Sequence, residues 1–293
     1  MKVAIIGGSG LYEIDGLEEI SEETCSTPFG QPSDSIITGK IGGTEVLFLA
    51  RHARGHKILP GELNHKANIY ALKELGAEII ISISAVGSFK DELKPGDIVL
   101  VDQFVDRTKR GLDHTFFGEG ITGHISFAQP TCLNLKAIIY QAAQTVLTVS
   151  NANNVSLHDG GTYINMEGPA FSTRAESQLY KSWGMDVIGM TNLAEAKLAR
   201  EAEICYQTVA MVTDYDCWHP NHEAVTVEMV IQTLMQNASL AKDLIIETIK
   251  CLENQNSCTV CPTALQVAIV TSADIVPDEI KNKLKPIIGK YIS

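Results

Sequence analysis

Short apolar runs alternate along the chain with longer segments in which apolar residues recur every three or four positions. A short run is typical of a buried strand, and the longer spacing is typical of a helix with one buried face. The runs that predict strands lie at residues 3–6, 35–41, 45–50, 78–84, 98–101, 162–166, 186–190 and 205–213. The segments that predict helices lie at residues 65–75, 133–149, 173–183, 193–202 and 224–249. This alternation predicts an α/β fold with a mixed or mostly parallel sheet.

Turn and cap residues mark the ends of several of these elements. Gly42 and Gly43 separate two strand-like runs and predict a hairpin. Asn64 and Ser172 directly precede two predicted helices and are their expected N-caps. The segment 224–249 predicts a long amphipathic helix. Its expected apolar stripe comprises Val227, Val230, Ile231, Leu234, Ala238, Ala241 and Ile245.

A polar segment at residues 253–262 is the stretch of the chain that most resembles a linker. It separates a large first part from a short tail whose helical pattern is interrupted by Pro277 and Pro286. We therefore expect one α/β domain at residues 1–252. The tail at residues 253–293 is expected to be helical and to pack on the same domain.

The composition is that of an ordinary globular protein, and it narrows the function classes. Hydrophobic residues make up 45% of the 293 residues, and charged residues make up 20%. The net charge of -12 disfavours nucleic-acid binding, because the chain has no excess of basic residues to neutralise phosphates. Apolar runs stay below the roughly 20 residues of a membrane helix, and the short apolar N-terminal run lacks a signal-peptide cleavage pattern. We expect a cytoplasmic protein with no membrane or nucleic-acid partner.

The seven cysteines, an odd number without an export signal, favour reduced thiols. Cys258 and Cys261 form a C-x-x-C, but no second close pair of Cys or His stands near it in the sequence. Because a zinc site needs four ligands, we expect no metal. A disulfide within this pair, or from the tail to Cys132 or Cys205, is the alternative for a thermophilic source.

The segment V-T-D-Y-D-C-W at residues 212–218 carries the most informative chemistry. Asp214 and Asp216 follow an apolar run, and alternation in an extended chain would point both carboxylates to one face. Burying a carboxylate is costly unless it has a partner or a proton. A purine suits both groups, because a ring nitrogen needs a proton and an exocyclic amine needs an acceptor. The alternative is a solvated turn at the end of a strand.

Three other predicted strand ends carry donors suited to phosphate. The donors are Ser9 in G-G-S-G, Arg51 with His52, and Ser84 with Ala85 in S-A-V-G-S. Ligands of open α/β sheets bind beyond the carboxyl ends of strands, so these sets together predict one anion site. The G-G-S-G turn is not a dinucleotide fingerprint, because Glu13 stands where the next glycine would be. Each set alone is equally consistent with a turn or a solvated loop.

Two further segments could form a wall for a nucleoside. Phe171 can stack on a base, and Ser172 can bind the edge of that base. Met190 can pack against a sugar, and Thr191 can reach a phosphate. The alternative for Phe171 is ordinary core packing.

Six segments occur together and in order: G-G-S-G-L-Y, F-L-A-R-H, N-x-x-A-N-I-Y-A-L-K, E-G-P-A-F-S-T-R-A-E-S, G-M-T and T-D-Y-D-C-W-H. In this set the chain resembles the purine nucleoside phosphorylase superfamily from residue 1 to about residue 252, and within it the S-methyl-5′-thioadenosine phosphorylases. Ala170 and Ala194 depart from an arginine and a proline that are frequent in the family. Neither position carries an expected ligand contact.

The resemblance implies a single α/β domain with a central twisted mixed sheet, partly barrel-like and flanked by helices. It also implies a homotrimer or a dimer of trimers, with sites near subunit boundaries, a phosphate co-substrate and no cofactor. The implied phosphate-binding residues are Ser9, Arg51, His52, Ser84, Ala85 and Thr191. The implied nucleoside-binding residues are Phe171, Ser172, Met190, Asp214 and Asp216, with His124 and Val227 near the 5′-methylthio group.

The implied reaction is the phosphate-dependent cleavage of S-methyl-5′-thioadenosine to adenine and 5-methylthioribose 1-phosphate, a step of purine and methionine salvage. Asp214 and Asp216 are the expected catalytic residues, with Asp214 protonating N7 and Asp216 accepting from the 6-amino group. One alternative is a phosphorylase for adenosine, inosine or methylthioinosine. Another is a nucleoside-binding protein without catalysis. The broken glycine fingerprint disfavours a nicotinamide dehydrogenase.

Overall fold

The computed structural model describes residues 1–8, 11, 14–150, 152, 154–220, 225–253, 255 and 257–292, without the side chains of 234, 236 and 237. The strands are β1 (Lys2–Gly7), β2 (Glu18–Glu23), β3 (Ile36–Ile41), β4 (Thr44–Ala50), β5 (Ile79–Ser88), β6 (Ile98–Leu100), β7 (Gln103–Asp106), β8 (Leu157–Asp159), β9 (Thr162–Asn165), β10 (Val187–Gly189) and β11 (Cys205–Asp214). The α-helices are α1 (His65–Glu74), α2 (Leu133–Val149), α3 (Arg174–Ser182), α4 (Asn192–Glu201), α5 (Val227–Leu252), α6 (Asp278–Lys283) and α7 (Lys285–Ile288). Short 3-10 helices lie at η1 (Pro60–Glu62), η2 (Gly111–His114) and η3 (Cys261–Thr263).

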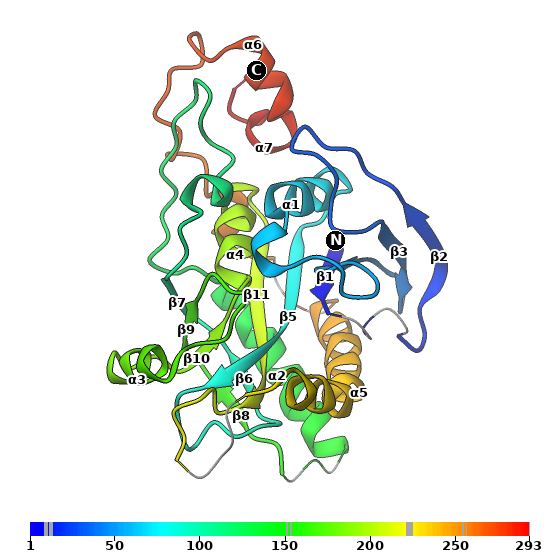
Figure 1. Cartoon of the computed structure of the whole chain (residues 1–293). Coiled ribbons are helices and arrows are strands. Elements are labelled where there is room, and N and C mark those ends of the chain that lie inside the picture. Colours follow the sequence, from blue (N-terminus) through cyan, green and yellow to red (C-terminus); the bar gives the residue numbers. More distant parts are fainter. Residues whose placement is uncertain are drawn as a thin grey trace.

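The strands form one mixed sheet that branches at β5. On one side, β1 pairs in parallel with β5 and β4, and the β3–β4 hairpin carries β2 outward. On the other side, the sheet continues along one path through β10, β9 and β7 and along another through β11, β6 and β8. β11 pairs with β5 along nearly its whole length (Figure 1). This branched mixed sheet confirms the α/β class expected from the sequence. The partly barrel-like form that the resemblance implies stays a prediction.

Helices cover both faces of the sheet, because successive strand residues point to opposite sides. Ala4 and Ile6 of β1 belong to one core, which is shared with α1, α4 and the tail. Val3 and Ile5 belong to a second core, which is shared with α2 and α5. Strands that are buried on both faces read as continuous apolar runs, and for this reason the sequence revealed the central strands clearly.

The element boundaries differ from the sequence predictions at a few points. β5 continues to Ser88, beyond the predicted end at residue 84. Thr173, not Ser172, caps α3: its hydroxyl accepts from Glu176 N at 3.2 Å, and Glu176 accepts from Thr173 N at 2.8 Å. This reciprocal pair is a capping box. β2, β7 and β8 were not predicted, because each is largely unburied and therefore lacks an apolar run.

Among the stripe residues whose side chains the structure describes, which leaves out Leu234, the fully buried ones lie in the second half of α5. Ala241 and Ile245 lie in the core, whereas Val227 and Ile231 are exposed. α5 begins at Val227, with the Thr226 hydroxyl accepting from Met229 N at 3.3 Å. The predicted start at Ala224 lies outside the described residues. The first half of α5 therefore presents apolar side chains to the surface.

The tail lies at the top of the molecule beside α1 (Figure 1). Leu265, Ile280, Leu284 and Ile287 belong to the same apolar core as α1 and α4. The hydroxyl of Tyr70 in α1 also donates to the carbonyl of Lys283 at 3.1 Å. In the part of the chain that the structure describes, no helix combines the length and apolar character needed to span a membrane.

Candidate active site

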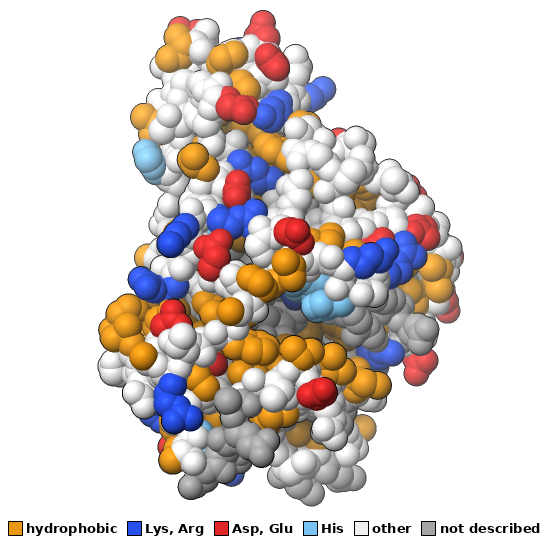
Figure 2. Space-filling view, viewed as in Figure 1, with side chains coloured by type: hydrophobic (Ala, Val, Ile, Leu, Met, Phe, Trp, Pro, Cys, Tyr) orange, Lys and Arg blue, Asp and Glu red, His pale blue; other side chains and the backbone are white. Residues whose placement is uncertain are grey.

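Several strand ends meet at one region of the branched sheet. The register pairs Gly7 of β1 with Ala50 of β4. Asp214 of β11 and Ile188 of β10 both pair with Gly87 of β5. Figure 2 shows a hollow on one face of the molecule, with histidine side chains above it and a band of apolar side chains below it. The strand ends place most of the residues singled out from the sequence in this region.

Asp214 and Asp216 are buried together, although strand alternation does not pair them. The Asp216 N–H donates to Asp214 Oδ1 at 2.7 Å, and Asp216 has a positive φ of 51°. Such a side-chain-to-backbone bond is characteristic of an Asx turn. The β5–β11 register also shifts between Val212 and Asp214. The pair therefore exists as expected, but the alternation argument for it was wrong, because Asp216 lies in a turn.

The surroundings of Asp214 suit a protonated carboxyl group. Its pKa is raised by burial, against the opposing effect of hydrogen bonds from Thr213 and the Asp216 backbone. Thr213 Oγ1 lies 2.7 Å from Asp214 Oδ2 and 3.2 Å from the carbonyl of Val86. A hydroxyl has one proton to donate. Both contacts are hydrogen bonds at once if Asp214 carries a proton on Oδ2 and donates it to Thr213, while Thr213 donates to Val86.

Asp216 keeps an unused hydrogen-bonding atom in this buried region. Its Oδ2 has no hydrogen-bond partner among the described residues. Burial and the neighbouring Asp214 raise the pKa of Asp216, and the hydroxyls of Ser177 and Ser172 lower it only in part. A buried oxygen without a partner costs about 1–3 kcal/mol, so a ligand donor would relieve this cost.

Gly87 makes room for the two aspartates. A Cβ atom at this position would lie 2.8 Å from Asp214 Oδ1 and 3.1 Å from Ile188 Cγ2. The first distance is shorter than the contacts that Cβ atoms make in folded proteins. Any side chain at residue 87 would therefore displace the Asp214 carboxyl group.

Arg51 is buried in a polar network with Glu195 of α4. Its Nε donates to Glu195 Oε1 at 2.5 Å, and Nη2 lies 3.2 Å from Oε2. Nη2 also donates to Ser82 Oγ at 2.6 Å, and Nη1 donates to the Ile83 carbonyl at 3.0 Å. Ser82 and Tyr206 in turn donate to Glu195. Burial opposes ionisation of Glu195, but the charge of Arg51 leaves the pKa of its carboxyl lowered.

These contacts fix the guanidinium at the end of β4. They use four of its five N–H donors, so one Nη1 hydrogen is left for a ligand. Direct binding of phosphate by Arg51 stays a prediction. The structure adds that Arg51 is held by a buried carboxylate, which the sequence analysis did not anticipate.

His52 is neutral at physiological pH. Burial, with the nearby charge of Arg51, lowers its pKa from 6.5 to about 4. Its Nδ1 lies 2.8 Å from the carbonyl of Ile58, which can only accept. The proton of the neutral ring is therefore on Nδ1, and Nε2 is an acceptor. Such an atom can accept a hydrogen bond from the O–H of a hydrogen phosphate ion.

The remaining predicted phosphate residues lie on β5 and at the start of α4. Ser84 and Ala85 pair with Ala210 and Met211 of β11, close to its end. Thr191 is the N-cap of α4, but its side chain does not cap the helix. The N-terminus of a helix favours an anion through its free N–H groups and its dipole. Ser9 lies outside the described residues.

The predicted base wall is joined to the aspartate pair. The Cys217 thiol donates to the Ser172 carbonyl at 3.4 Å, which links the segment before α3 to the turn after β11. Phe171 is 41% exposed, so core packing does not explain it. Met190 packs against Gly168, where a Cβ atom would lie 2.5 Å from its sulfur.

Two predicted residues are not brought to the aspartates by direct contacts in this chain. His124 is exposed, and its N–H donates to the carbonyl of Ala268 in the tail at 2.8 Å. Val227 is exposed at the first position of α5. Among the described residues, the segment before Val227 is linked to the pair, because Val225 N donates to the Asp216 carbonyl at 3.3 Å.

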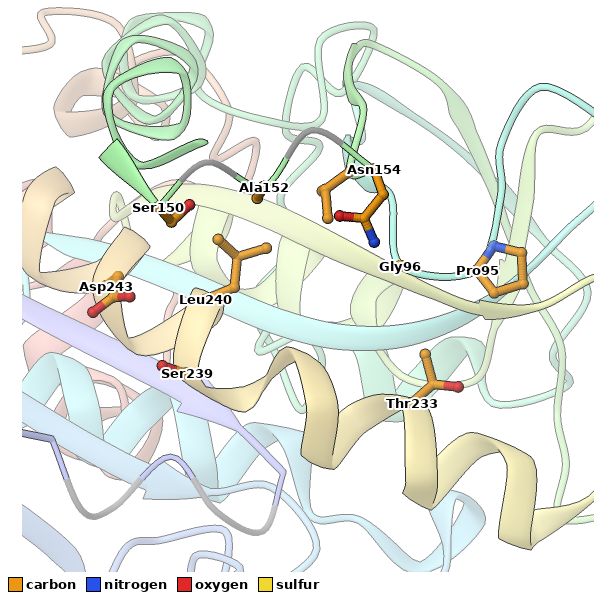
Figure 3. A pocket seen from close by; sticks show the side chains of 10 residues that line it. Pro95, Gly96, Ser150, Ala152, Asn154, Thr233, Ser239, Leu240 and Asp243 are labelled. Carbon is orange, nitrogen blue, oxygen red and sulfur yellow. The ribbon is translucent and has the colours of Figure 1, made fainter. Parts of the chain in front are cut away.

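A hollow of about 420 Å³ lies elsewhere, between α5 and the loop that follows α2 (Figure 3). In Figure 3, Thr233 and Leu240 of α5 face Asn154 and the turn at Pro95 across this space. Among the described residues, its lining includes none of those expected to bind phosphate or nucleoside. The location of the chemistry at the strand ends stays a prediction.

The fold and these strand ends define an α/β phosphorylase. The chain matches the phosphorylase superfamily over residues 2–250 and belongs to this family. The S-methyl-5′-thioadenosine phosphorylase of Koribacter versatilis is 53% identical to it over 290 residues, 99% of this chain and 96% of the relative. That of Geobacter sulfurreducens is 50% identical over 99% of both chains.

Solved structures agree with these sequence relatives. A methylthioadenosine phosphorylase from an Antarctic soil metagenomic library superposes with a TM-score of 0.91 and 44% identity, covering 97% of this chain and 98% of the other. A mutant adenosine/methylthioadenosine phosphorylase of Schistosoma mansoni, in complex with methylthioadenosine, gives a TM-score of 0.80 and 34% identity. That match covers 87% of this chain and 93% of the other. The resemblance inferred from sequence motifs is confirmed.

Sequence reasoning missed two residues that shape the site. Glu195 lies one helical turn after Thr191, and an acidic residue in the first turn of α4 reads as an ordinary dipole partner. Gly87 reads as a turn glycine after an apolar run. The side-chain contacts between α4 and the end of β4 show that Glu195 supports Arg51. The pairing of β5 with β11 shows that Gly87 lies against Asp214.

Proposed function

We propose that this chain cleaves S-methyl-5′-thioadenosine with phosphate, giving adenine and 5-methylthioribose 1-phosphate. The buried aspartate pair carries the proposal. One carboxyl has surroundings that suit a proton, and the other has an oxygen with no partner among the described residues. A 6-aminopurine leaving group needs these two functions, because N7 must gain a proton and the amine must donate to an acceptor.

Phosphate attacks the anomeric carbon as the bond from that carbon to N9 of adenine breaks. The sugar becomes cation-like, and the negative nucleophile stabilises it. Asp214 gives up its hydrogen bond to Thr213 and donates the proton to N7, so adenine leaves as a neutral molecule and the carboxylate later regains a proton from solvent. Arg51 supplies positive charge, and neutral His52 accepts from the phosphate O–H. Ser9, Ser84, Ala85 and Thr191 complete the proposed phosphate site.

Asp216 selects the base in this proposal. The amine of adenine can donate to its unpartnered oxygen, whereas the carbonyl of a 6-oxopurine would face an acceptor. An unmatched buried pair costs about 1–3 kcal/mol or more, which separates the two purine classes by about fivefold or more. Phe171 and Ser172 would hold the ring, and Met190 would pack on the ribose.

The pocket for the 5′-methylthio group requires more than one chain in this proposal. Val227 and Ile231 leave apolar surface uncovered at the start of α5. His124 is held by the tail and lies exposed, so it would reach a neighbour's pocket. We infer a homotrimer, or a dimer of trimers, in which His124 of one subunit and Val227 of the next border the methylthio group.

The remaining expectations complete the proposal. Residues 1–252 form the nucleoside phosphorylase domain, and the tail shares its core. The enzyme works in the cytoplasm, in purine and methionine salvage. It binds nucleoside and phosphate rather than nucleic acid or membrane, and its chemistry needs no cofactor.

A substrate panel tests the proposal. Initial rates are measured in phosphate with S-methyl-5′-thioadenosine, adenosine, inosine and methylthioinosine. We expect the highest kcat/KM for S-methyl-5′-thioadenosine. Adenosine is the second candidate, because the Schistosoma mansoni enzyme with this fold is named for both substrates. Equal or faster cleavage of inosine would contradict the proposed base selection, and binding without cleavage would indicate a non-catalytic nucleoside binder.

A further inference from the structure

Four cysteines from three distant parts of the chain meet at one point. Cys132 precedes α2, Cys205 begins β11, and Cys258 and Cys261 belong to the tail. Their sulfur atoms all lie within 4.8 Å of one another. The sequence argument against a metal rested on the lack of a second pair near the C-x-x-C. Sequence distance does not decide the ligand set, because folding brings Cys132 and Cys205 to the C-x-x-C as a second pair.

The arrangement fits a tetrahedral metal ion. Zinc–sulfur bonds of about 2.3 Å in tetrahedral geometry place the sulfur atoms about 3.8 Å apart. The four sulfurs need only small shifts to reach this spacing. A four-sulfur tetrahedron suits zinc or iron and does not suit magnesium or calcium, which prefer oxygen. A disulfide would instead draw the sulfurs together in pairs, at about 2 Å.

The backbone around the sulfurs supports negative charge on them. The N–H of Cys261 points to Cys258 Sγ at 3.4 Å, and the N–H of Leu135 points to Cys132 Sγ at 3.5 Å. Cys132 is also the N-cap of the 17-residue helix α2, where the dipole favours an anion. Three of the four cysteines are buried and Cys258 is partly buried, so the site is shielded from solvent.

The cluster is remote from the candidate active site. Cys205 and Asp214 are the first and last residues of the ten-residue strand β11, which puts them about 30 Å apart along the strand. Sulfur occupies all four positions, so no position is open for a substrate or a reactive water. Such closed sites are structural.

We propose that Cys132, Cys205, Cys258 and Cys261 bind one Zn²⁺ ion that fastens the tail to α2 and β11. Binding displaces the protons of the thiols that are still protonated. The ion then cross-links the segment after α5 to the start of β11 and the start of α2.

Metal analysis of the purified full-length chain tests the proposal directly. After gel filtration without chelator, we expect about one zinc per subunit by elemental mass spectrometry. The Cys258→Ser/Cys261→Ser double variant should lose more than nine-tenths of this zinc. Cys251→Ser is the matched control, because Cys251 lies in α5 beside the same core but outside the cluster. It should retain full zinc content.

A thiol count and a cobalt spectrum test the proposed zinc site even if the double variant does not fold. The native chain is unfolded with chelator and without reductant, and its thiols are titrated. All seven cysteines should react.

Cobalt added to metal-free chain should give the visible d–d bands and the thiolate charge-transfer band of tetrahedral sulfur ligation. A count of three thiols without zinc would overturn the proposal in favour of two disulfides. Seven thiols, with neither zinc nor the cobalt bands, would overturn it in favour of a metal-free cluster.

Discussion

The burial of Asp214 and Asp216, which the proposed function requires, lowers the stability of the folded chain. Burial raises the pKa of both carboxyl groups, so deprotonation of either one in the folded state is unfavourable. A group whose folded pKa is raised above its unfolded value stabilises the fold least at high pH, where the unfolded carboxyl ionises freely. The pair therefore lowers the free energy of unfolding at neutral pH. This burial is needed for one carboxyl to act as a general acid and the other to accept from the amine.

Asp216 is the residue at which base choice is most directly tested. Asp216→Asn replaces an acceptor with an amide that can donate to a 6-oxo group. We expect kcat/KM for S-methyl-5′-thioadenosine to fall and that for methylthioinosine to rise, shifting their ratio by about tenfold or more. The exposed Asp274→Asn is the control. An unchanged ratio in Asp216→Asn would show that another residue selects the base.

A substitution at Gly87 changes the shape of the site around Asp214 and leaves the charges of the site unchanged. Gly87→Ala would push a methyl group against Asp214 Oδ1 and Ile188. We expect a loss of kcat/KM of about 100-fold, in line with misplacement of a general acid. Gly61→Ala is the matched control, because a Cβ there meets no atom within 4 Å. Steady-state rates and circular dichroism of both variants provide the measurement. Wild-type activity in Gly87→Ala would mean that Asp214 does not need its present position.

At the scale of elements, α4 and β4 are coupled through the Arg51–Glu195 pair. Glu195→Gln leaves Arg51 as a buried charge with a neutral partner. We expect the KM for phosphate to rise at least tenfold while that for nucleoside changes little, and the free energy of unfolding to fall by about 3 kcal/mol. Glu247→Gln removes only a surface pair with Lys250 and is the control. Equal rises in both KM values would contradict a specific role of Arg51 in phosphate binding.

The sequence predicted the elements that bury apolar residues and missed those that do not. β1, β4, β5 and β11 are apolar runs, and α2 begins and ends at the predicted residues. The exposed residues of β2 carry no such pattern, because that strand is an edge strand supported only by β3. The support of Arg51 by Glu195 and the meeting of Cys132 with Cys258 depend on tertiary contacts, which no local pattern encodes.

At the scale of the whole molecule, buried histidines lower the free energy of unfolding at acidic pH. Burial lowers the pKa of His65 from 6.5 to about 3. Below pH 6.5 the unfolded chain takes up a proton at this residue and the folded chain does not. The free energy of unfolding therefore falls as the pH falls, by about 1.4 kcal/mol per pH unit for this histidine, until the folded pKa is reached.

A variant pair isolates this effect. His65→Gln removes the titrating group, so the slope of unfolding free energy between pH 6 and pH 4 should become shallower by about 1.4 kcal/mol per unit. Tyr70→Phe in the same helix removes a hydrogen bond to Lys283 and leaves His65 in place. This variant should lower the free energy of unfolding at every pH without changing its slope against pH. Denaturant titrations at several pH values measure both. Identical slopes in His65→Gln and wild type would refute the assignment.

The proposed reaction is phosphorolysis in which a protonated Asp214 is the general acid. The most direct measurement is the ultraviolet detection of adenine released from S-methyl-5′-thioadenosine, with and without phosphate, by wild type and Asp214→Asn. We expect release only with phosphate, and a fall in kcat of about 100-fold or more in the variant, because the isosteric amide cannot protonate N7. Release that is independent of phosphate would show a hydrolase, and full activity in Asp214→Asn would contradict the proposed proton donor.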